Sequence, residues 1–249
     1  MKKKINKIAL LLVMLAGMPW CARAQQYTGM TGLIQVPSAE MNEKSTARIG
    51  AHFLNKAFSP SSFRHNGKKY HTISHYLNLT PFSWIEMAYT CTFFRTQQKG
   101  SERVGFYQKD RYFSIKVRPL EEGKWWPAIA LGSNDPYSAT QKSSDAGCMH
   151  FTNYYLAASK HLLWRGDEWG VHLSYRYFRK EFNSDWNGVV GGLTYRPRFA
   201  PTLRLIAEYT GKDCNVGADC LLWKHLLVQA SLQDGKHFTG GMAFQIRLK

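Results

Sequence analysis

The side chains that most often carry catalysis do not form a recognisable motif in this chain. His71 and His75 lie four residues apart in the segment HTISH, but the HExxH zinc motif also requires a helix and a glutamate after the first histidine. No GxSxG segment is present, so the nucleophile elbow of the α/β hydrolases is absent. Glu121 and Glu122 are adjacent and would point to opposite faces of a strand. We therefore expect no catalytic residues, no cofactor and no metal ion.

Cysteine chemistry is limited to disulfide formation. Beyond residue 24 the cysteines are Cys91, Cys148, Cys214 and Cys220, and no two of them form a CxxC pair. A zinc ribbon or a thioredoxin-type site is therefore not expected. Cys214 and Cys220 bracket the turn-like segment NVGAD, and a disulfide between them would close a small loop. Four cysteines permit three pairings, and the sequence does not choose among them.

Basic charge is the most prominent chemical feature. The chain has 33 Lys and Arg against 17 Asp and Glu, a formal net charge of +16. Such an excess is typical of proteins that bind nucleic acid. Here the basic residues are spread along the chain instead of being clustered, and five of them lie within residues 1–24, without which the net charge falls to +11. We therefore expect no nucleic-acid partner.

The first 24 residues have the three parts of an export signal. Four lysines precede an apolar run at 8–18, and Ala22-Arg23-Ala24 fits an A-x-A cleavage site. Eleven apolar residues are too few to span a bilayer as a helix, and the mean hydropathy of −0.37 excludes a protein with many membrane helices. We expect residues 1–24 to be a cleavable signal peptide and the mature chain to begin near Gln25.

Cys21 leaves open a second interpretation, in which the chain is a lipoprotein acylated at this cysteine. Small residues precede the acylated cysteine in that class of signal, whereas Pro19 and Trp20 precede Cys21. We therefore favour cleavage after Ala24. In both cases the chain is exported and meets conditions that permit disulfides.

Beyond residue 45 the sequence alternates between apolar and polar residues and has almost no helical periodicity. In 168–178, for example, Trp169, Val171 and Leu173 alternate with polar residues. These segments are about ten residues long, the length that a tilted strand needs to cross a membrane. About twelve such segments are present, at 46–54, 70–79, 84–95, 109–118, 127–133, 151–163, 168–178, 187–196, 201–210, 214–223, 225–233 and 242–249.

Aromatic residues lie near the ends of these segments, where an outer-membrane barrel has its aromatic girdles. We expect an all-β fold: a single antiparallel transmembrane β-barrel of about 12 strands at 46–249, after an N-terminal lead-in segment at 25–45. A secreted β-sandwich is the alternative, because sandwiches are also rich in aromatic residues. The aromatic residues in question are Tyr70, Trp84, Tyr112, Trp125, Trp126, Trp164, Trp169, Tyr209 and Trp223.

Strand alternation also assigns the charges. If the apolar series of each strand faces lipid, the charged series faces the lumen, because a charge on the lipid face costs about 2–4 kcal/mol near the midplane. A positive lumen would attract anions. Alternatively, the basic side chains pair with the acidic ones, with carbonyl groups or with tyrosine hydroxyls in a packed interior, which we favour because a barrel of this size is narrow. The expected lumen residues are the basic Arg48, Lys116, Arg118, Arg176, Arg196, Arg204 and Arg247 and the acidic Glu86 and Glu208.

Several segments occur in the order and spacing of one known family. The segments are TGLIQVPSAEM at 31–41, LTPFSWIEMAYT at 79–90, QKDRYFSIKVRPLEE at 108–122, PAIALGSNDP at 127–136 and YYLAASK at 154–160. In these segments the chain resembles the YjbH family, exported outer-membrane proteins linked to exopolysaccharide production in Gram-negative bacteria. The resemblance covers about half of the mature chain and implies an outer-membrane location.

Together these observations predict an outer-membrane β-barrel that supports the export or assembly of surface polysaccharide, or the passage of small anionic solutes, without catalysis. The expected partners are outer-membrane lipid, the barrel-assembly machinery, and acidic polysaccharide or envelope-export proteins. Two alternatives stay open. One is a secreted carbohydrate-binding β-sandwich, and the other is a barrel enzyme that acts on lipids or glycans.

Overall fold

The structure is a computed structural model of the chain. It describes residues 24–248, apart from residues 58, 60–63, 66–67, 98–99, 101–102, 137–149 and 180. The signal peptide expected at 1–24, with Cys21, and Cys148 therefore lie outside the described residues, apart from Ala24. Among the described residues, no helix has the length and apolar character needed to cross a membrane.

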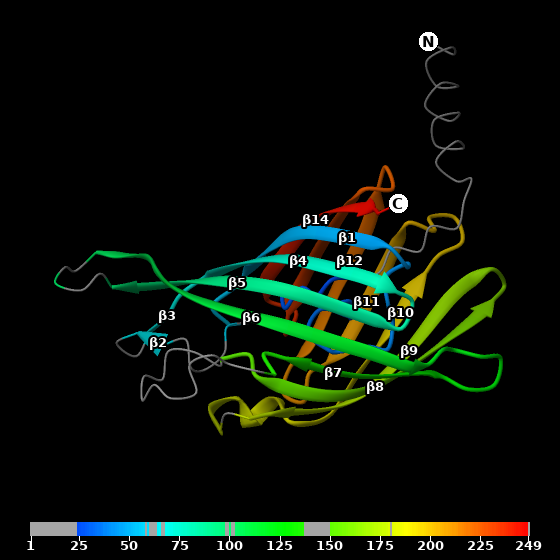
Figure 1. The fold of residues 1–249 in the computed structure, drawn as a ribbon, viewed down its shortest axis with the longest axis horizontal. Helices are drawn as coiled ribbons and strands as arrows, with labels where there is room; N and C mark the ends of the chain where they lie inside the picture. Colours follow the sequence, from blue (N-terminus) through cyan, green and yellow to red (C-terminus); the bar gives the residue numbers. More distant parts are fainter. Residues whose placement is uncertain are drawn as a thin grey trace, which may run out of the picture.

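Twelve strands form one closed antiparallel barrel (Figure 1). Each strand pairs with its neighbours in sequence, and β1 closes the barrel by pairing with both β4 and β14. The barrel strands are β1 (Thr46–Leu54), β4 (Thr72–Phe82), β5 (Ile85–Gln97), β6 (Val104–Leu120), β7 (Ala128–Asn134), β8 (Asn153–Trp164), β9 (Asp167–Phe178), β10 (Gly188–Arg196), β11 (Leu203–Tyr209), β12 (Cys214–Leu222), β13 (Leu226–Gln233) and β14 (His237–Arg247). The predicted all-β barrel of about 12 strands is confirmed.

Two minor elements lie in the connections between these strands. A small hairpin of β2 (Arg64–His65) and β3 (Lys68–Lys69) belongs to the connection from β1 to β4. A short 3-10 helix, η1 (Glu181–Trp186), belongs to the connection from β9 to β10.

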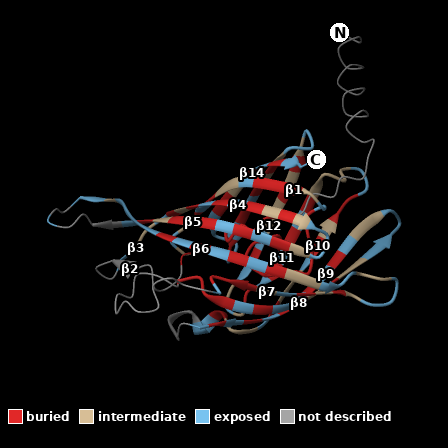
Figure 2. Cartoon of the chain, viewed as in Figure 1, coloured by how far each residue is buried: buried red, intermediate tan, exposed pale blue. Residues whose placement is uncertain are grey.

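Side chains alternate between the outer surface and the lumen along each strand, as Figure 2 shows in alternating colours. In β9, Trp169, Leu173 and Tyr175 are 40–57% exposed, whereas His172 and Arg176 are 2–3% exposed. Successive residues of a strand point to opposite faces, so an apolar outer surface and a polar lumen follow from one alternating pattern. The outer surface is the apolar belt that a barrel needs to lie in lipid.

The two ends of the barrel differ in the length of their connections. At the end that we call the turn end, the strands are joined by residues 83–84, 121–127, 165–166, 197–202 and 223–225. At the opposite end, the loop end, the connections include 55–71 and 135–152. Exposed tryptophans lie at the turn end, together with Phe82 and Phe199, and several other exposed Tyr and Phe lie toward the loop end. The tryptophans are Trp84, Trp125, Trp126, Trp164, Trp169 and Trp223, and the others include Phe53, Tyr175, Tyr177, Tyr209 and Phe238.

One expected girdle residue lies elsewhere. Tyr112 is buried in the lumen, where its ring centroid lies 5.1 Å from that of Phe151. The assignment of Tyr112 to a girdle is therefore wrong. Its position in β6 has the inward parity of Ser114 and Lys116, and strand parity determines its orientation.

The segment before β1 is not a simple lead-in. All residues from 24 to 42 are buried, and the segment lies inside the barrel (Figure 1, dark blue). It is folded on itself by two isolated bridges, Gln25 with Thr31 and Gly32 with Pro37. We call residues 24–42 the plug.

Cys214 and Cys220 do not form the disulfide that their spacing suggested. Both cysteines are free and lie on the single strand β12, because NVGAD is part of this strand and not a turn. Six residues of strand separate their Cα atoms by about 20 Å. A disulfide requires Cα atoms no more than about 7 Å apart.

Candidate functional site

The plug is held by two buried carboxylates of the barrel wall. Glu208 of β11 accepts backbone N–H groups of Ile34, Gln35 and Val36 at 2.9–3.0 Å. Glu86 of β5 accepts the backbone N–H and the hydroxyl of Thr31 at 2.7 and 2.8 Å. An irregular segment leaves backbone donors without partners, and buried donors of this kind must be satisfied by side chains. Both glutamates therefore bind the plug by accepting its backbone N–H groups.

Basic side chains of the wall satisfy the carbonyl groups of the same segment. Lys116 Nζ donates to the carbonyl oxygens of Thr31 and Glu40, both at 2.7 Å, and lies 3.0 Å from Glu86. Arg176 donates to the carbonyl oxygen of Gln35 at 3.1 Å and to those of Trp186 in η1 and Thr210 after β11. These contacts hold the plug by both its donors and its acceptors.

Two further arginines have buried acceptors. Arg48 donates to the side-chain oxygens of Gln25 in the plug at 2.8 Å and of Gln245 in β14 at 2.9 Å. Arg204 contacts Glu40 of the plug at 2.8 Å and Asp219 of β12 at 2.9 Å. Each arginine therefore joins the plug to the wall.

Three basic residues expected in the lumen lie toward the turn end. Arg196 pairs with Glu168 there, and Arg118 donates to the carbonyl oxygen of Ser83 and to Glu121. The side chain of Arg247 is 65% exposed and lies 3.8 Å from Glu43, so its lumen assignment is wrong. Its position is the end of β14, where the alternating pattern of the strand no longer points a long side chain into the barrel.

Small polar side chains of the wall complete the contacts. The hydroxyl of Ser74 donates to the carbonyl of Tyr27 at 2.9 Å, and that of Thr90 to Thr28 at 2.7 Å. The hydroxyl of Ser159 accepts the N–H of Ala39 at 2.9 Å. The wall therefore follows the plug along most of its length.

Apolar contacts are part of the same fit. Leu33 and Ile34 of the plug belong to one buried cluster with wall residues that include Val190 and Ile206. A Cβ atom at Gly192 would lie 2.5 Å from Leu33 Cδ1, so this inward position of β10 has room for the plug only as glycine. Plug and wall side chains are therefore in close contact at these positions.

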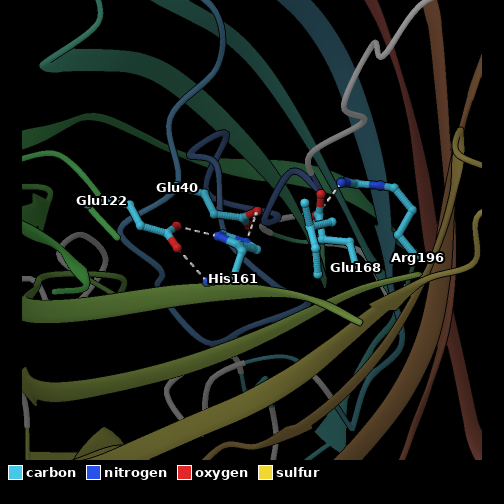
Figure 3. A pocket seen from close by; sticks show the side chains of 7 residues that line it. Glu40, Glu122, His161, Glu168 and Arg196 are labelled. Carbon is cyan, nitrogen blue, oxygen red and sulfur yellow. Dashed lines mark hydrogen bonds and ion pairs between the residues drawn. The ribbon is translucent and has the colours of Figure 1, made fainter. Parts of the chain in front are cut away.

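A polar pocket of about 420 Å³ lies beside the plug at the turn end (Figure 3). Its lining includes Glu40 of the plug, Glu122 of the connection from β6 to β7, and His161 of β8. His161 Nδ1 lies 2.7 Å from Glu122 Oε2, and His161 Nε2 lies 3.4 Å from Glu40 Oε1. Glu168 and Arg196 form the opposite side of the pocket.

The surroundings keep both carboxylates of this pocket ionised. Burial raises the pKa of Glu40, but Arg204 and then His161 outweigh it and hold the pKa well below its usual value. Burial likewise raises the pKa of Glu122, but hydrogen bonds from His161 and Lys160 lower it to a net value below the usual one. The pocket beside the plug is therefore lined by carboxylates with a fixed negative charge.

A serine–histidine pair lies deeper in the lumen. Ser159 Oγ is 2.9 Å from His172 Nδ1, and His172 Nε2 is 3.2 Å from Thr194 Oγ1. Both side chains are buried, and Ser159 already accepts an N–H of the plug. This arrangement anchors the plug and gives no substrate access to the hydroxyl.

Several residues that matter here were not singled out from the sequence. Glu40, His161, His172 and Asp219 lie in the lumen, and the last three have the inward parity of their strands. Strand parity therefore contained the signal for these three. For Glu40 there was none, because it belongs to an irregular segment whose position inside the barrel is not encoded by periodicity.

Comparisons with known proteins give similarities in sequence and in structure. One curated relative, the "uncharacterized lipoprotein YjbH" of Escherichia coli (strain K12), is 33% identical over 141 residues, which are 55% of this chain. The chain spans only 17% of the length of that relative.

Solved structures with similar strand arrangements include two outer-membrane phospholipases. The calcium-bound dimer from Salmonella typhi has a TM-score of 0.37 at 14% identity and covers 83% of this chain and 91% of that chain. Phospholipase A from Escherichia coli has a TM-score of 0.36 at 14% identity and covers 83% and 97%. Wzi, a carbohydrate-binding barrel involved in group 1 capsule assembly in Escherichia coli, has a TM-score of 0.32 at 11% identity and covers 77% and 55%.

The family comparison concerns the plug and the first half of the barrel. The model of the YjbH family, described as exopolysaccharide biosynthesis protein YbjH, matches residues 24–175. These residues are more than half of the chain and include the five segments whose resemblance the sequence showed. The chain belongs to the YjbH family.

Proposed function

We propose that this barrel lies in the outer membrane and supports the export or assembly of a surface polysaccharide as a plugged scaffold, not as an open pore. The filled lumen carries the proposal, because residues 24–42 occupy it and bind to wall groups on all sides. The family description supports the link to exopolysaccharide. The chain spans only 17% of the length of its curated relative, so the link to exopolysaccharide is proposed for this chain and rests on the family description.

The outer surface supports the location in a membrane. Its apolar side chains form a belt between exposed tryptophans at one end and exposed Tyr and Phe toward the other. By the usual asymmetry of outer-membrane barrels, the turn end faces the periplasm and the loop end faces outward. Outer-membrane lipid and the barrel-assembly machinery are the partners that this placement requires.

The lumen charges argue against the passage of small anions. Lys116, Arg176 and Arg204, which would attract anions in an open barrel, already bind plug carbonyls or carboxylates. A basic group that is paired and buried adds little to the potential felt by a passing solute. We therefore place anion contact outside the lumen.

The hairpin of β5 and β6 offers basic side chains at the loop end. Arg95, Lys109 and Arg111 are exposed there, and Arg95 lies over the ring of Phe106 at 5.4 Å. An acidic polysaccharide would meet this face after export, and charge attraction would hold it weakly near the barrel. Envelope-export proteins are the other partners that we propose.

The proposal includes no catalytic step. The buried pair Ser159 and His172 serves the plug, so the barrel is proposed not to hydrolyse lipids or glycans. Release of fatty acids or sugars by the purified, folded barrel from a panel of phospholipids and glycans would contradict this part.

Surface polysaccharide tests the proposed role directly. Deletion of the gene in its own host is expected to lower surface polysaccharide, and the unchanged gene restores it. A variant with Arg95, Lys109 and Arg111 replaced by Gln is expected to restore less. A matched control replaces three basic residues of the turn end, Lys124, Arg165 and Lys224, and is expected to restore fully.

Two outcomes would contradict the proposal. An unchanged amount of surface polysaccharide after deletion of the gene would contradict the proposed role. Recovery of the protein in the soluble periplasmic fraction would contradict the membrane location. A heat-modifiable gel shift of each variant shows that it is folded, so loss of function is not confused with loss of the barrel.

A further inference from the structure

Three potential metal ligands from separate segments meet beside the pocket at the turn end. Glu40 belongs to the plug, His161 to β8 and His172 to β9, and one ligand atom of each lies within 4.8 Å of the others. We propose that these three side chains bind a Zn²⁺ ion that fastens the plug to the barrel wall. The sequence did not indicate such a site, because the histidines are eleven residues apart on paired strands.

The donor set suits zinc. Two imidazoles and one carboxylate form one of the recurrent zinc ligand sets, with a fourth position left for water. In a tetrahedral site with bonds of about 2.0–2.1 Å, neighbouring donors lie about 3.4 Å apart. Glu40 Oε1 and His161 Nε2 already have this separation, 3.4 Å. The three ligand atoms lie within 4.8 Å of one another, so His172 has to move toward the other two donors when the ion binds.

Both imidazoles are oriented by partners on the side away from the proposed ion. His161 Nδ1 lies 2.7 Å from Glu122 Oε2, and His172 Nδ1 lies 2.9 Å from Ser159 Oγ. This leaves Nε2 of His161 for the metal. Nε2 of His172 lies 3.2 Å from Thr194 Oγ1, and the metal has to take the place of this hydroxyl. A carboxylate bound to the far nitrogen of a ligating histidine is a recurrent feature of zinc sites, because it fixes the ring and makes the ligand more basic.

A glycine lets the two histidines approach. A Cβ atom at Gly170 would lie 2.8 Å from His172 Nε2 and 3.1 Å from His161 Cδ2. The ring centroids of the two histidines are 5.5 Å apart. Gly170 therefore lies directly beside both imidazoles, at the point where β8 and β9 pair.

Charge at the site leaves room for a cation. Glu40, Glu122 and Asp219 contribute three negative charges, and Arg204 and Lys160 contribute two positive ones. Arg204 Nη1 lies closer to Glu40 Oε2, at 2.8 Å, than to Oε1, at 3.1 Å. Oε1, which faces His161, is therefore the oxygen that a metal would take.

An ion has a route to this position. The pocket of about 420 Å³ is lined by Glu40, Glu122 and His161 (Figure 3). An ion that enters from the turn end therefore reaches Glu40 and His161 directly, and His172 lies buried next to His161, with ring centroids 5.5 Å apart.

Zinc binding by the folded full chain, without a histidine tag, tests the inference. Calorimetric titration with ZnCl₂ is expected to give one ion per barrel, and Co²⁺ is expected to give the visible absorption of a tetrahedral site. His161→Gln with His172→Gln is expected to abolish both signals. Glu122→Gln, which leaves the three ligands intact, is expected to weaken binding 10- to 100-fold.

The matched control is the exposed His225 at the same end of the barrel. His225→Gln is expected to bind zinc as the unchanged chain does. Absence of stoichiometric binding by the unchanged chain, or binding that survives the loss of both His161 and His172, would overturn the inference. If the double variant does not fold, an unchanged affinity in Glu122→Gln overturns it. These outcomes do not depend on the polysaccharide role.

Discussion

Single carboxylates have an unusually large part in holding the plug. Glu208 accepts the N–H groups of three successive plug residues, Ile34 to Val36, and also the side-chain amide of Asn215 at 2.8 Å. A short, irregular turn presents its donors in one direction, and an ionised carboxylate is the strongest acceptor available for them. One side chain thus replaces the regular pairing that this segment lacks.

Replacement of this carboxylate tests its importance. In Glu208→Gln, the amide group presents donors to the plug N–H groups, so we expect the turn to be destabilised by about 1–3 kcal/mol. Hydrogen exchange at the amides of residues 34–36 measures the change as faster local opening. The control is Glu121→Gln, an exposed carboxylate at the turn end, for which these amides should keep their protection. Equal exchange in both variants would contradict the role of Glu208.

Glu40 gives the stability of the plug a pH dependence. Its pKa lies well below the usual value of 4.5, so its contribution is fully present above that value and is lost as the pH falls through the folded-state pKa. We expect the difference in unfolding free energy between the unchanged chain and Glu40→Gln to be constant above about pH 5 and to shrink below about pH 4. Urea unfolding in lipid vesicles measures it. If the difference between the two unfolding free energies does not change with pH across this range, the role of ionised Glu40 is contradicted.

At the scale of the strand, alternation determines nearly everything that could be predicted. The strands, their number and the inward positions of Lys116, Arg176 and Arg204 follow from a two-residue period, because one face must be apolar in lipid. Hydrophobicity alone, without the position in the strand, would place Leu221 and Leu227 on the lipid face. Both have inward parity and pack together in a buried cluster.

The lipid-facing assignment of β9 is open to a direct test. Leu173 lies near the middle of the strand and faces outward, so Leu173→Arg is expected to lower the unfolding free energy by about 2–4 kcal/mol. Trp169 faces the same side close to the turn end. The charge introduced by Trp169→Arg is therefore expected to lower the unfolding free energy by only about 0–1 kcal/mol. Urea titration in vesicles compares the two. An equal loss at both depths would contradict a membrane-embedded β9.

The plug and its pocket lie beyond what periodicity predicts. Gly32, Pro37 and Ser38 indicate a turn before the first strand, but no repeating pattern places that turn inside the barrel. Its location follows from long-range contacts such as Ile34 with Glu208, which are 174 residues apart. Clusters such as Glu40 with His161 and His172 depend on the same kind of long-range contact. A single sequence therefore does not predict that these residues lie close together.

For the whole molecule, the plug predicts electrical behaviour. The unchanged barrel is expected to give no steady conductance in a planar bilayer, because packed side chains fill the lumen at the plug. Loss of two anchors, in Glu208→Ala with Arg176→Ala, is expected to give intermittent openings. The outward-facing pair Leu205→Ala with Tyr175→Ala is the control and should stay closed. Steady conductance by the unchanged barrel would contradict the plugged lumen.

The position of the plug directly before β1 has a consequence for the order of assembly. Closure of the barrel requires β1 to pair with β14, so it waits for the last strand of the described chain. The plug is tethered to β1 and contacts strands from β1 to β11, so its full set of contacts forms only when these strands have come together. Plug and wall therefore complete each other late in folding, and a barrel without these plug contacts is expected to finish folding more slowly.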